Sequence, residues 1–123
     1  MEYAIENEYL IVTVTTWGAQ VKSVVRKFDD VEHMWQADKS VWGYHAPILF
    51  PHTGKVVDDL IETKGEVYQA KQHGFARLME HTLVRQTEDT IVMELRSSEE
   101  TLRIFPYAFR LVSTFTLDGD TLH

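Results

Sequence analysis

Imidazole is the side chain best suited to proton transfer near neutral pH, and this chain carries six histidines and no cysteine. The histidines are His33, His45, His52, His73, His81 and His123. No two of them are four residues apart and none lies in a His-Glu-x-x-His motif, so the spacing predicts no metal site. The lack of cysteine excludes disulfides and thiolate chemistry. We therefore expect neither a metal nor another cofactor.

His73 has the most suggestive neighbours of the six, in the sequence Gln72-His73-Gly74-Phe75-Ala76-Arg77. Gly74 permits a tight backbone beside the imidazole. Phe75 can supply an apolar wall, and Gln72 or Arg77 can hydrogen-bond a polar ligand. A single histidine is more often a surface or structural residue, and this is how we interpret the other five. The hexapeptide alone leaves both interpretations of His73 open.

The elements that must position these residues follow a period of two. Alternating, β-branched or aromatic stretches predict strands at 10–15, 21–27 and 109–117, and hairpins at 60–68 and 82–95. The only helical signal is a short turn within 97–102, for which Ser98 is a candidate N-cap. Two prolines make 46–54 a poor central strand, so we expect a fixed loop there. Short strands separated by turn signals predict an all-β, antiparallel sandwich or barrel.

Charge and length narrow the partners. The formal net charge of -7 carries no basic block, so we expect no nucleic acid partner. No apolar run is long enough to span a bilayer, and the N-terminus lacks the pattern of a signal peptide, so we expect a cytoplasmic protein that does not bind membranes. The 123 residues suit one domain, or one piece of a larger one.

The C-terminus suggests the second of these. Asp118-Gly119 is a strong hairpin signal, yet the sequence stops four residues later, at His123. We therefore expect a sandwich that is incomplete at the C-terminus. Its open sheet edge is a place where copies of the chain could associate.

An ordered set of motifs runs through almost the whole chain. The set resembles the aldose 1-epimerase (galactose mutarotase-like) superfamily, and most closely its LacX-like branch. The motifs are Trp17-Gly18-Ala19-Gln20, Met34-Trp35-Gln36, the run from Trp42 to Lys55, Lys64-Gly65-Glu66-Val67-Tyr68, Gln72-His73-Gly74-Phe75-Ala76-Arg77, Ser97-Ser98-Glu99-Glu100-Thr101, Phe105-Pro106-Tyr107-Ala108-Phe109 and Thr116-Leu117-Asp118-Gly119.

The resemblance implies that residues 1–123 are the N-terminal portion of a single β-sandwich domain with a sugar-binding cleft. Members of this family interconvert the anomers of free aldoses: a glutamate takes the anomeric hydroxyl proton, a histidine donates toward the ring oxygen, and the ring opens and recloses. The family's first active-site histidine matches His73. The resemblance places its second histidine, its sugar-binding aspartate and its glutamate base beyond His123.

The resemblance also implies substrate-binding roles for Lys55, Gln72, Phe75, Arg77 and Trp42. The family often has arginine where this chain has Lys55, and a lysine offers one compact charge in place of a planar fork of donors. A solvated loop lysine is an equally good interpretation. We expect Lys55 and His73 to line one concave surface on the same sheet face, Trp42 to lie near it, and Trp17 and Trp35 to be buried in the core.

Three functions follow as alternatives. The first is an isomerase of carbohydrate metabolism whose chain here is truncated and weakly active or inactive. The second is a non-catalytic carbohydrate-binding remnant. The third is a small β-domain that binds a protein partner through its open sheet edge, which the family motifs disfavour. Within the first, a hexose-6-phosphate epimerase-like protein ranks lower because only one arginine, Arg77, lies close to the motif for binding a phosphate.

Overall fold

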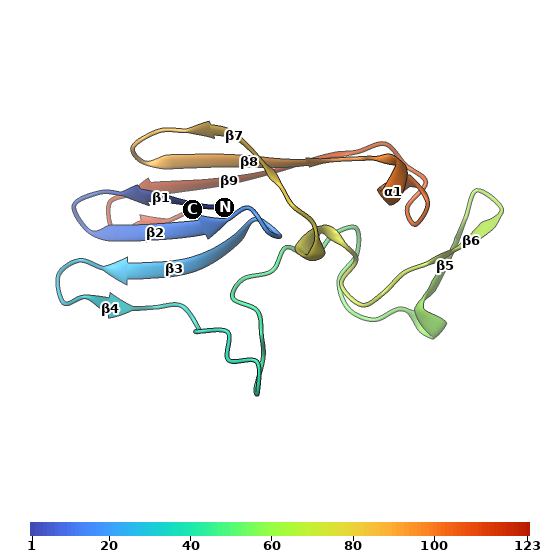
Figure 1. Ribbon diagram of the computed structural model, residues 1–123, viewed down its shortest axis with the longest axis horizontal. Helices are drawn as coiled ribbons and strands as arrows, with labels where there is room; N and C mark the ends of the chain where they lie inside the picture. Colours follow the sequence, from blue (N-terminus) through green and yellow to red (C-terminus); the bar gives the residue numbers. More distant parts are fainter.

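Side chains of alternating burial build the two sheets of the protein, whose computed structural model describes residues 1–123. Both sheets are antiparallel and four-stranded (Figure 1). The first has the order β1–β2–β3–β4 and comprises β1 (Glu2–Glu6), β2 (Leu10–Thr15), β3 (Gln20–Arg26) and β4 (Val31–Glu32). The second has the order β10–β9–β8–β7 and comprises β7 (Thr82–Gln86), β8 (Thr90–Arg96), β9 (Arg110–Asp118) and β10 (Thr121–Leu122).

The core lies between these sheets. Strict alternation along β2 and β8 turns every second side chain inward, as a period of two requires. The buried apolar cluster draws on both sheets and consists of Ile5, Leu10, Val12, Val14, Ala19, Val21, Ile91, Met93 and Leu117. The predicted all-β antiparallel sandwich is confirmed.

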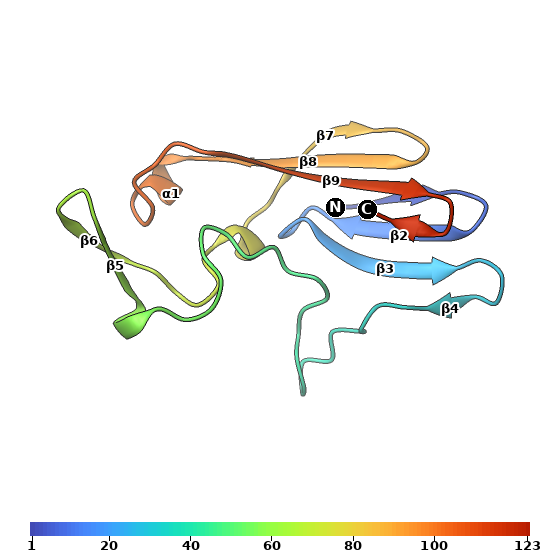
Figure 2. The same ribbon diagram turned by 180° about the vertical axis from the view of Figure 1, so that it is seen from behind.

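A third, two-stranded sheet projects away from the sandwich (Figures 1 and 2). It is the hairpin of β5 (Leu60–Thr63) and β6 (Glu66–Gln69), preceded by the 3-10 turn η1 (Val57–Asp59). A second 3-10 turn, η2 (Ala76–Leu78), leads back to β7. The predicted loop at 46–54 has no strand, only an isolated bridge at Phe50.

The only α-helical turn is α1 (Glu99–Leu102), in the predicted position. The side chain of its N-cap, Ser98, accepts from the Thr101 N–H, and the Thr101 hydroxyl in turn accepts from the Ser98 N–H. This capping box satisfies two groups that a helix of one turn would leave unpaired. No helix of the structure has the length and apolarity needed to cross a membrane.

Two tryptophans depart from the prediction. Trp17 and Trp35 were expected in the core, but their side chains are 49% and 39% exposed. Trp17 follows the end of β2, where its backbone bridges to Glu80. Trp35 lies in the irregular segment after β4, where its indole N–H donates to the Trp42 carbonyl at 2.8 Å. Neither residue therefore sits on the inward face of a strand, which is where these sheets form their core.

Candidate functional site

His73 is held against Gly54 by two reciprocal hydrogen bonds. The His73 N–H donates to the Gly54 carbonyl, and the Gly54 N–H donates to His73 Nδ1, both at 2.9 Å. A ring nitrogen that accepts from a backbone amide carries no proton, so Nε2 carries the proton of the neutral imidazole. Nε2 lies 3.4 Å from the side-chain nitrogen of Gln72. That nitrogen is itself a donor, so in this tautomer the Nε2–H makes no hydrogen bond to it. The imidazole is thus oriented to donate from Nε2.

The backbone at this position is unusual. His73 has φ of 66° and Gly74 has φ of 70°, so both residues are left-handed. Left-handed conformations of residues other than glycine cost energy, and they cluster at functional sites. Gly74 is required by close approach as well, because a Cβ there would lie 2.1 Å from the carbonyl oxygen of Phe50. The same oxygen accepts from the N–H groups of Phe75 and Ala76, which joins the two loops.

A second set of contacts extends from Gln72 to Trp42. Arg77 Nη2 donates to the Gln72 carbonyl at 3.2 Å, and the guanidinium lies 4.8 Å from the ring centroid of Tyr44. The Tyr44 ring is in turn 5.8 Å from the ring of Trp42, between centroids. The Trp42 side chain is 47% exposed. Cation–π and aromatic contacts therefore pack the segment around Trp42 against the His73 loop.

Lys55 is exposed and follows Gly54, the residue paired with His73. It takes part in none of the six ion pairs of the chain. The structure places Lys55 and His73 in two adjoining loops, whereas we expected them on the face of a sheet. We call the surface formed by Trp42, Tyr44, Lys55, Gln72, His73 and Arg77 the His73 cluster.

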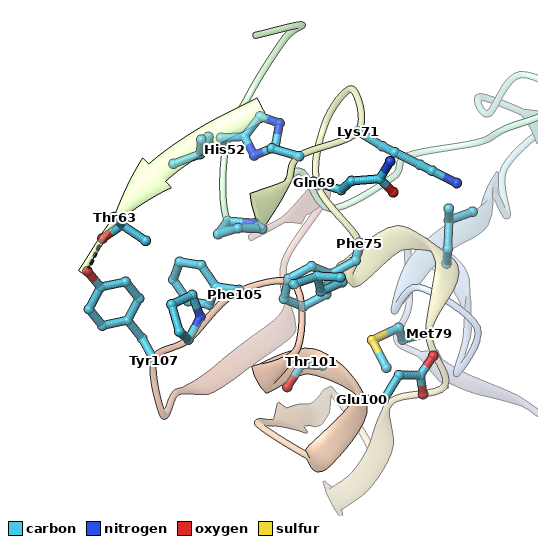
Figure 3. A pocket seen from close by; sticks show the side chains of 17 residues that line it. His52, Thr63, Gln69, Lys71, Phe75, Met79, Glu100, Thr101, Phe105 and Tyr107 are labelled. Carbon is cyan, nitrogen blue, oxygen red and sulfur yellow. Dashed lines mark hydrogen bonds between the residues drawn. The ribbon is translucent and has the colours of Figure 1, made fainter. Parts of the chain in front are cut away.

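Phe75 turns away from this cluster into a group of aromatic side chains. Its ring lies 5.8 to 6.2 Å, between centroids, from the rings of Phe50, Phe105 and Phe109. Phe75 and Phe105 line a cavity of about 410 Å³, together with parts of the β5–β6 hairpin and α1 (Figure 3). Of the predicted site residues only Phe75 lines this cavity, so its contacts there are those of a packing residue.

His81 is a buried residue that contacts the turn next to the His73 cluster. Its side chain is 2% exposed, and Nε2 lies 3.0 Å from the Ala76 carbonyl, which belongs to the turn that carries Arg77. Its backbone N–H donates to Thr16 at the end of β2. Burial lowers the pKa of His81, so the ring is neutral and its Nε2–H donates to Ala76. A neutral His81 therefore ties η2 to the sandwich.

The family described as aldose 1-epimerase matches residues 1–123 of this sequence. The chain belongs to the aldose 1-epimerase family. Protein LacX of Lactococcus lactis subsp. lactis, in its plasmid and chromosomal forms, is 33% identical over 127 residues. This match covers 99% of the chain and 42% of LacX. The resemblance to the LacX-like branch is thus confirmed.

Two solved structures of aldose 1-epimerase relatives share the fold closely. A galactose mutarotase related enzyme from Lactobacillus acidophilus is 37% identical with a TM-score of 0.98, and a galactose mutarotase-like protein from Lactobacillus casei is 33% identical with a TM-score of 0.95. Each match covers 99% of this chain, but only 41% and 42% of those proteins. The chain thus spans well under half the length of the relatives it matches.

Sequence reasoning did not find every member of the cluster in this aldose 1-epimerase family chain. Tyr44 contacts both Trp42 and Arg77. The sequence analysis included it in the run from Trp42 to Lys55 but predicted no role for it. Its spacing of two from Trp42 gave a weak signal, because the contact with Arg77 spans 33 residues and depends on how two loops meet.

Proposed function

We propose that the chain supplies the His73 part of a sugar-binding site in an aldose 1-epimerase-like protein that interconverts anomers by acid–base ring opening. The observation that carries this proposal is the pairing of His73 Nδ1 with the Gly54 N–H, which leaves the proton on Nε2. In the proposed reaction Nε2–H donates toward the ring oxygen as the bond from C1 to that oxygen breaks. Rotation about the C1–C2 bond turns the other face of the aldehyde toward the same oxygen. That oxygen then returns its proton to Nε2 and re-forms the bond to C1, while the carbonyl oxygen regains a proton, which gives the other anomer.

The rest of the His73 cluster offers what a sugar ring needs. The exposed Trp42 ring and the neighbouring Tyr44 present aromatic faces that suit the apolar side of a pyranose. Lys55 and the Gln72 amide are exposed donors for hydroxyl groups. Arg77 is already committed to Tyr44 and the Gln72 carbonyl, and we infer that it acts mainly by positioning them. Because Arg77 is the single arginine of the cluster, a phosphorylated hexose fits it less well.

Ring opening also needs a base at the anomeric hydroxyl. The hydrogen bonds of the His73 cluster involve backbone carbonyls, a backbone amide and the His73 ring, and none involves a carboxylate. Each positioned acid or base contributes roughly 10²–10⁴-fold in rate. We therefore propose that this chain by itself is weakly active or inactive. The same observation favours the second candidate, a carbohydrate-binding role without catalysis.

Polarimetry on freshly dissolved α-galactose or α-glucose tests catalysis, and intrinsic tryptophan fluorescence during sugar titration tests binding. The variant is His73→Asn, because asparagine tolerates a left-handed backbone but cannot transfer the proton. His33→Asn, at an exposed position after β4, is the matched control. We expect sugar binding that His73→Asn weakens and His33→Asn leaves unchanged, with any His73-dependent acceleration below about 10²-fold.

The other outcomes separate the candidates. Binding without any His73-dependent rate would favour the non-catalytic role. Fast, His73-dependent mutarotation would show that a base is supplied within this chain or by a second copy. The absence of both sugar binding and rate acceleration would contradict a sugar site at His73.

A further inference from the structure

The turn between β2 and β3 lies at the end of the sandwich that faces η2 and the β5–β6 hairpin (Figures 1 and 2). It contains the motif Trp17-Gly18-Ala19-Gln20, none of whose side chains belongs to the His73 cluster. Ala19 and Gln20 are buried, with 0% and 6% of their surface exposed. A buried amide side chain such as that of Gln20 costs free energy unless its polar atoms find partners. We therefore expect its hydrogen bond to be a part of the fold and not an incidental surface contact.

One side of this turn contacts the backbone that carries Arg77. The Gly18 N–H donates to the Met79 carbonyl at 2.8 Å. A Cβ at Gly18 would lie 2.6 Å from the Arg77 carbonyl oxygen, so only glycine allows the two backbones to come this close. Arg77 is therefore held against the sandwich through its own main chain.

The other side of the turn reaches the loop that carries Trp42. The Gln20 side-chain oxygen Oε1 accepts from the His45 N–H at 3.2 Å. We call residues 35–49 the Trp42 segment. The His45 bond is the only hydrogen bond from this segment to a strand of either four-stranded sheet, since the others stay within the segment or end on its neighbour Met34. A single hydrogen bond therefore ties the Trp42 segment to the sandwich.

This hydrogen bond orients the segment, whereas its apolar contacts do not. Ala46 is partly buried and packs against the apolar core, but apolar contacts have no preferred direction. A hydrogen bond does have one. His45 directly follows Tyr44, whose ring centroid lies 4.8 Å from the Arg77 guanidinium carbon. The bond from His45 to Gln20 is therefore what fixes where Tyr44 meets Arg77.

We propose that Gln20 is a positioning residue of the His73 cluster. Its buried side chain fixes Tyr44 and Trp42 against Arg77, while the backbone of the same turn fixes Arg77 itself. One turn of the sandwich thus holds both partners of the contact that joins the two loops. Gln20 acts through Tyr44 and touches no sugar. The role in sugar binding rests on the proposed function, because it assumes that the aromatic faces of Trp42 and Tyr44 contact the substrate.

Nuclear magnetic resonance on the 123-residue chain tests this role. Gln20→Met keeps the length of the side chain but removes the oxygen acceptor, and Gln20→Glu restores an acceptor at the same place. Gln86→Met is the matched control, because the Gln86 side chain also makes one hydrogen bond to a backbone group, at 2.7 Å to the Ala4 carbonyl, between β7 and β1. Circular dichroism verifies that each variant keeps its β structure.

Three quantities are measured: hydrogen exchange of the His45 N–H, the nuclear Overhauser contact between Tyr44 and Arg77, and the dissociation constant for galactose. We expect Gln20→Met to speed the exchange at least about tenfold and to abolish the contact. The dissociation constant should rise about 2–10-fold, the effect of one lost hydrogen bond on how well the site is pre-organised. Gln20→Glu should restore the contact and bring the dissociation constant within about twofold of the unmodified chain, and Gln86→Met should change none of the three.

Several results would overturn the role of Gln20. An unchanged contact between Tyr44 and Arg77 in Gln20→Met would do so, and so would its loss in Gln86→Met or a lost contact with unchanged galactose affinity. If Gln20→Met does not fold, the unmodified chain decides: a slowly exchanging His45 N–H supports the role, and a rapidly exchanging one contradicts it. If the unmodified chain binds no sugar, the proposed function fails, while the contact between Tyr44 and Arg77 still tests Gln20. The two failures are therefore distinguishable.

Discussion

Replacing Gly74 by alanine should destabilise the protein far more than the same change at Gly65. At position 74 the new Cβ would lie 2.1 Å from the Phe50 carbonyl oxygen, far inside the 3.0 Å below which such contacts essentially never occur. The backbone must move by about 1 Å to relieve the clash. That movement strains the hydrogen bonds that Phe50 accepts from the N–H groups of Phe75 and Ala76.

The magnitude has two parts. A non-glycine residue in the left-handed region costs about 1–2 kcal/mol, and each lost hydrogen bond adds about 0.5–1.5 kcal/mol. We therefore expect Gly74→Ala to lower the free energy of unfolding by about 2–5 kcal/mol. Gly65 has φ of 75° but no atom within 4 Å of a new Cβ, so Gly65→Ala isolates the conformational cost of about 1–2 kcal/mol.

Urea denaturation of both variants, followed by circular dichroism, measures the difference directly. Chemical shifts of the His73 ring report whether the neighbouring site moves. Equal destabilisation by Gly74→Ala and Gly65→Ala would refute the claim that the approach of Phe50 to Gly74 builds this loop.

Two further predictions concern His81 and Ser98. Burial lowers the pKa of His81, so the unfolded chain binds a proton more readily than the folded one, and His81 contributes stability that is lost as the pH falls below the unfolded value of about 6.5. Between pH 7 and pH 5 the free energy of unfolding, measured by urea denaturation, should fall more for the unmodified chain than for His81→Gln. Equal decreases would contradict a buried neutral His81. Ser98→Ala removes the capping box of α1 and should cost about 1 kcal/mol. Thermal denaturation measures that cost, and an unchanged midpoint would argue that the cap does not stabilise the segment.

Much of the fold could be predicted because the alternation of apolar and polar residues along a strand indicates which of its faces is buried. The alternation in β2, β8 and β9 is visible in the sequence, and so are the turn residues of the β5–β6 hairpin and the cap at Ser98. The two-residue strand β4 gave no such signal, since two residues cannot show a period. The predicted burial of Trp17 and Trp35 was wrong for a related reason. Their size suggested the core, but their burial depends on loops, whose conformation no periodic pattern indicates.

For the candidate site, too, some features follow from local sequence and others only from the tertiary structure. Local sequence determined that His73 is followed by a glycine, that Gly54 ends a proline-containing loop, and that the chain belongs to the aldose 1-epimerase family. Only the tertiary structure decided that Gly54 pairs with the His73 ring, that Tyr44 lies beneath Arg77, and that Phe75 faces an apolar cavity instead of the cluster. Periodic patterns record which face of an element is buried, whereas contacts between loops depend on where the whole sandwich holds the ends of those loops.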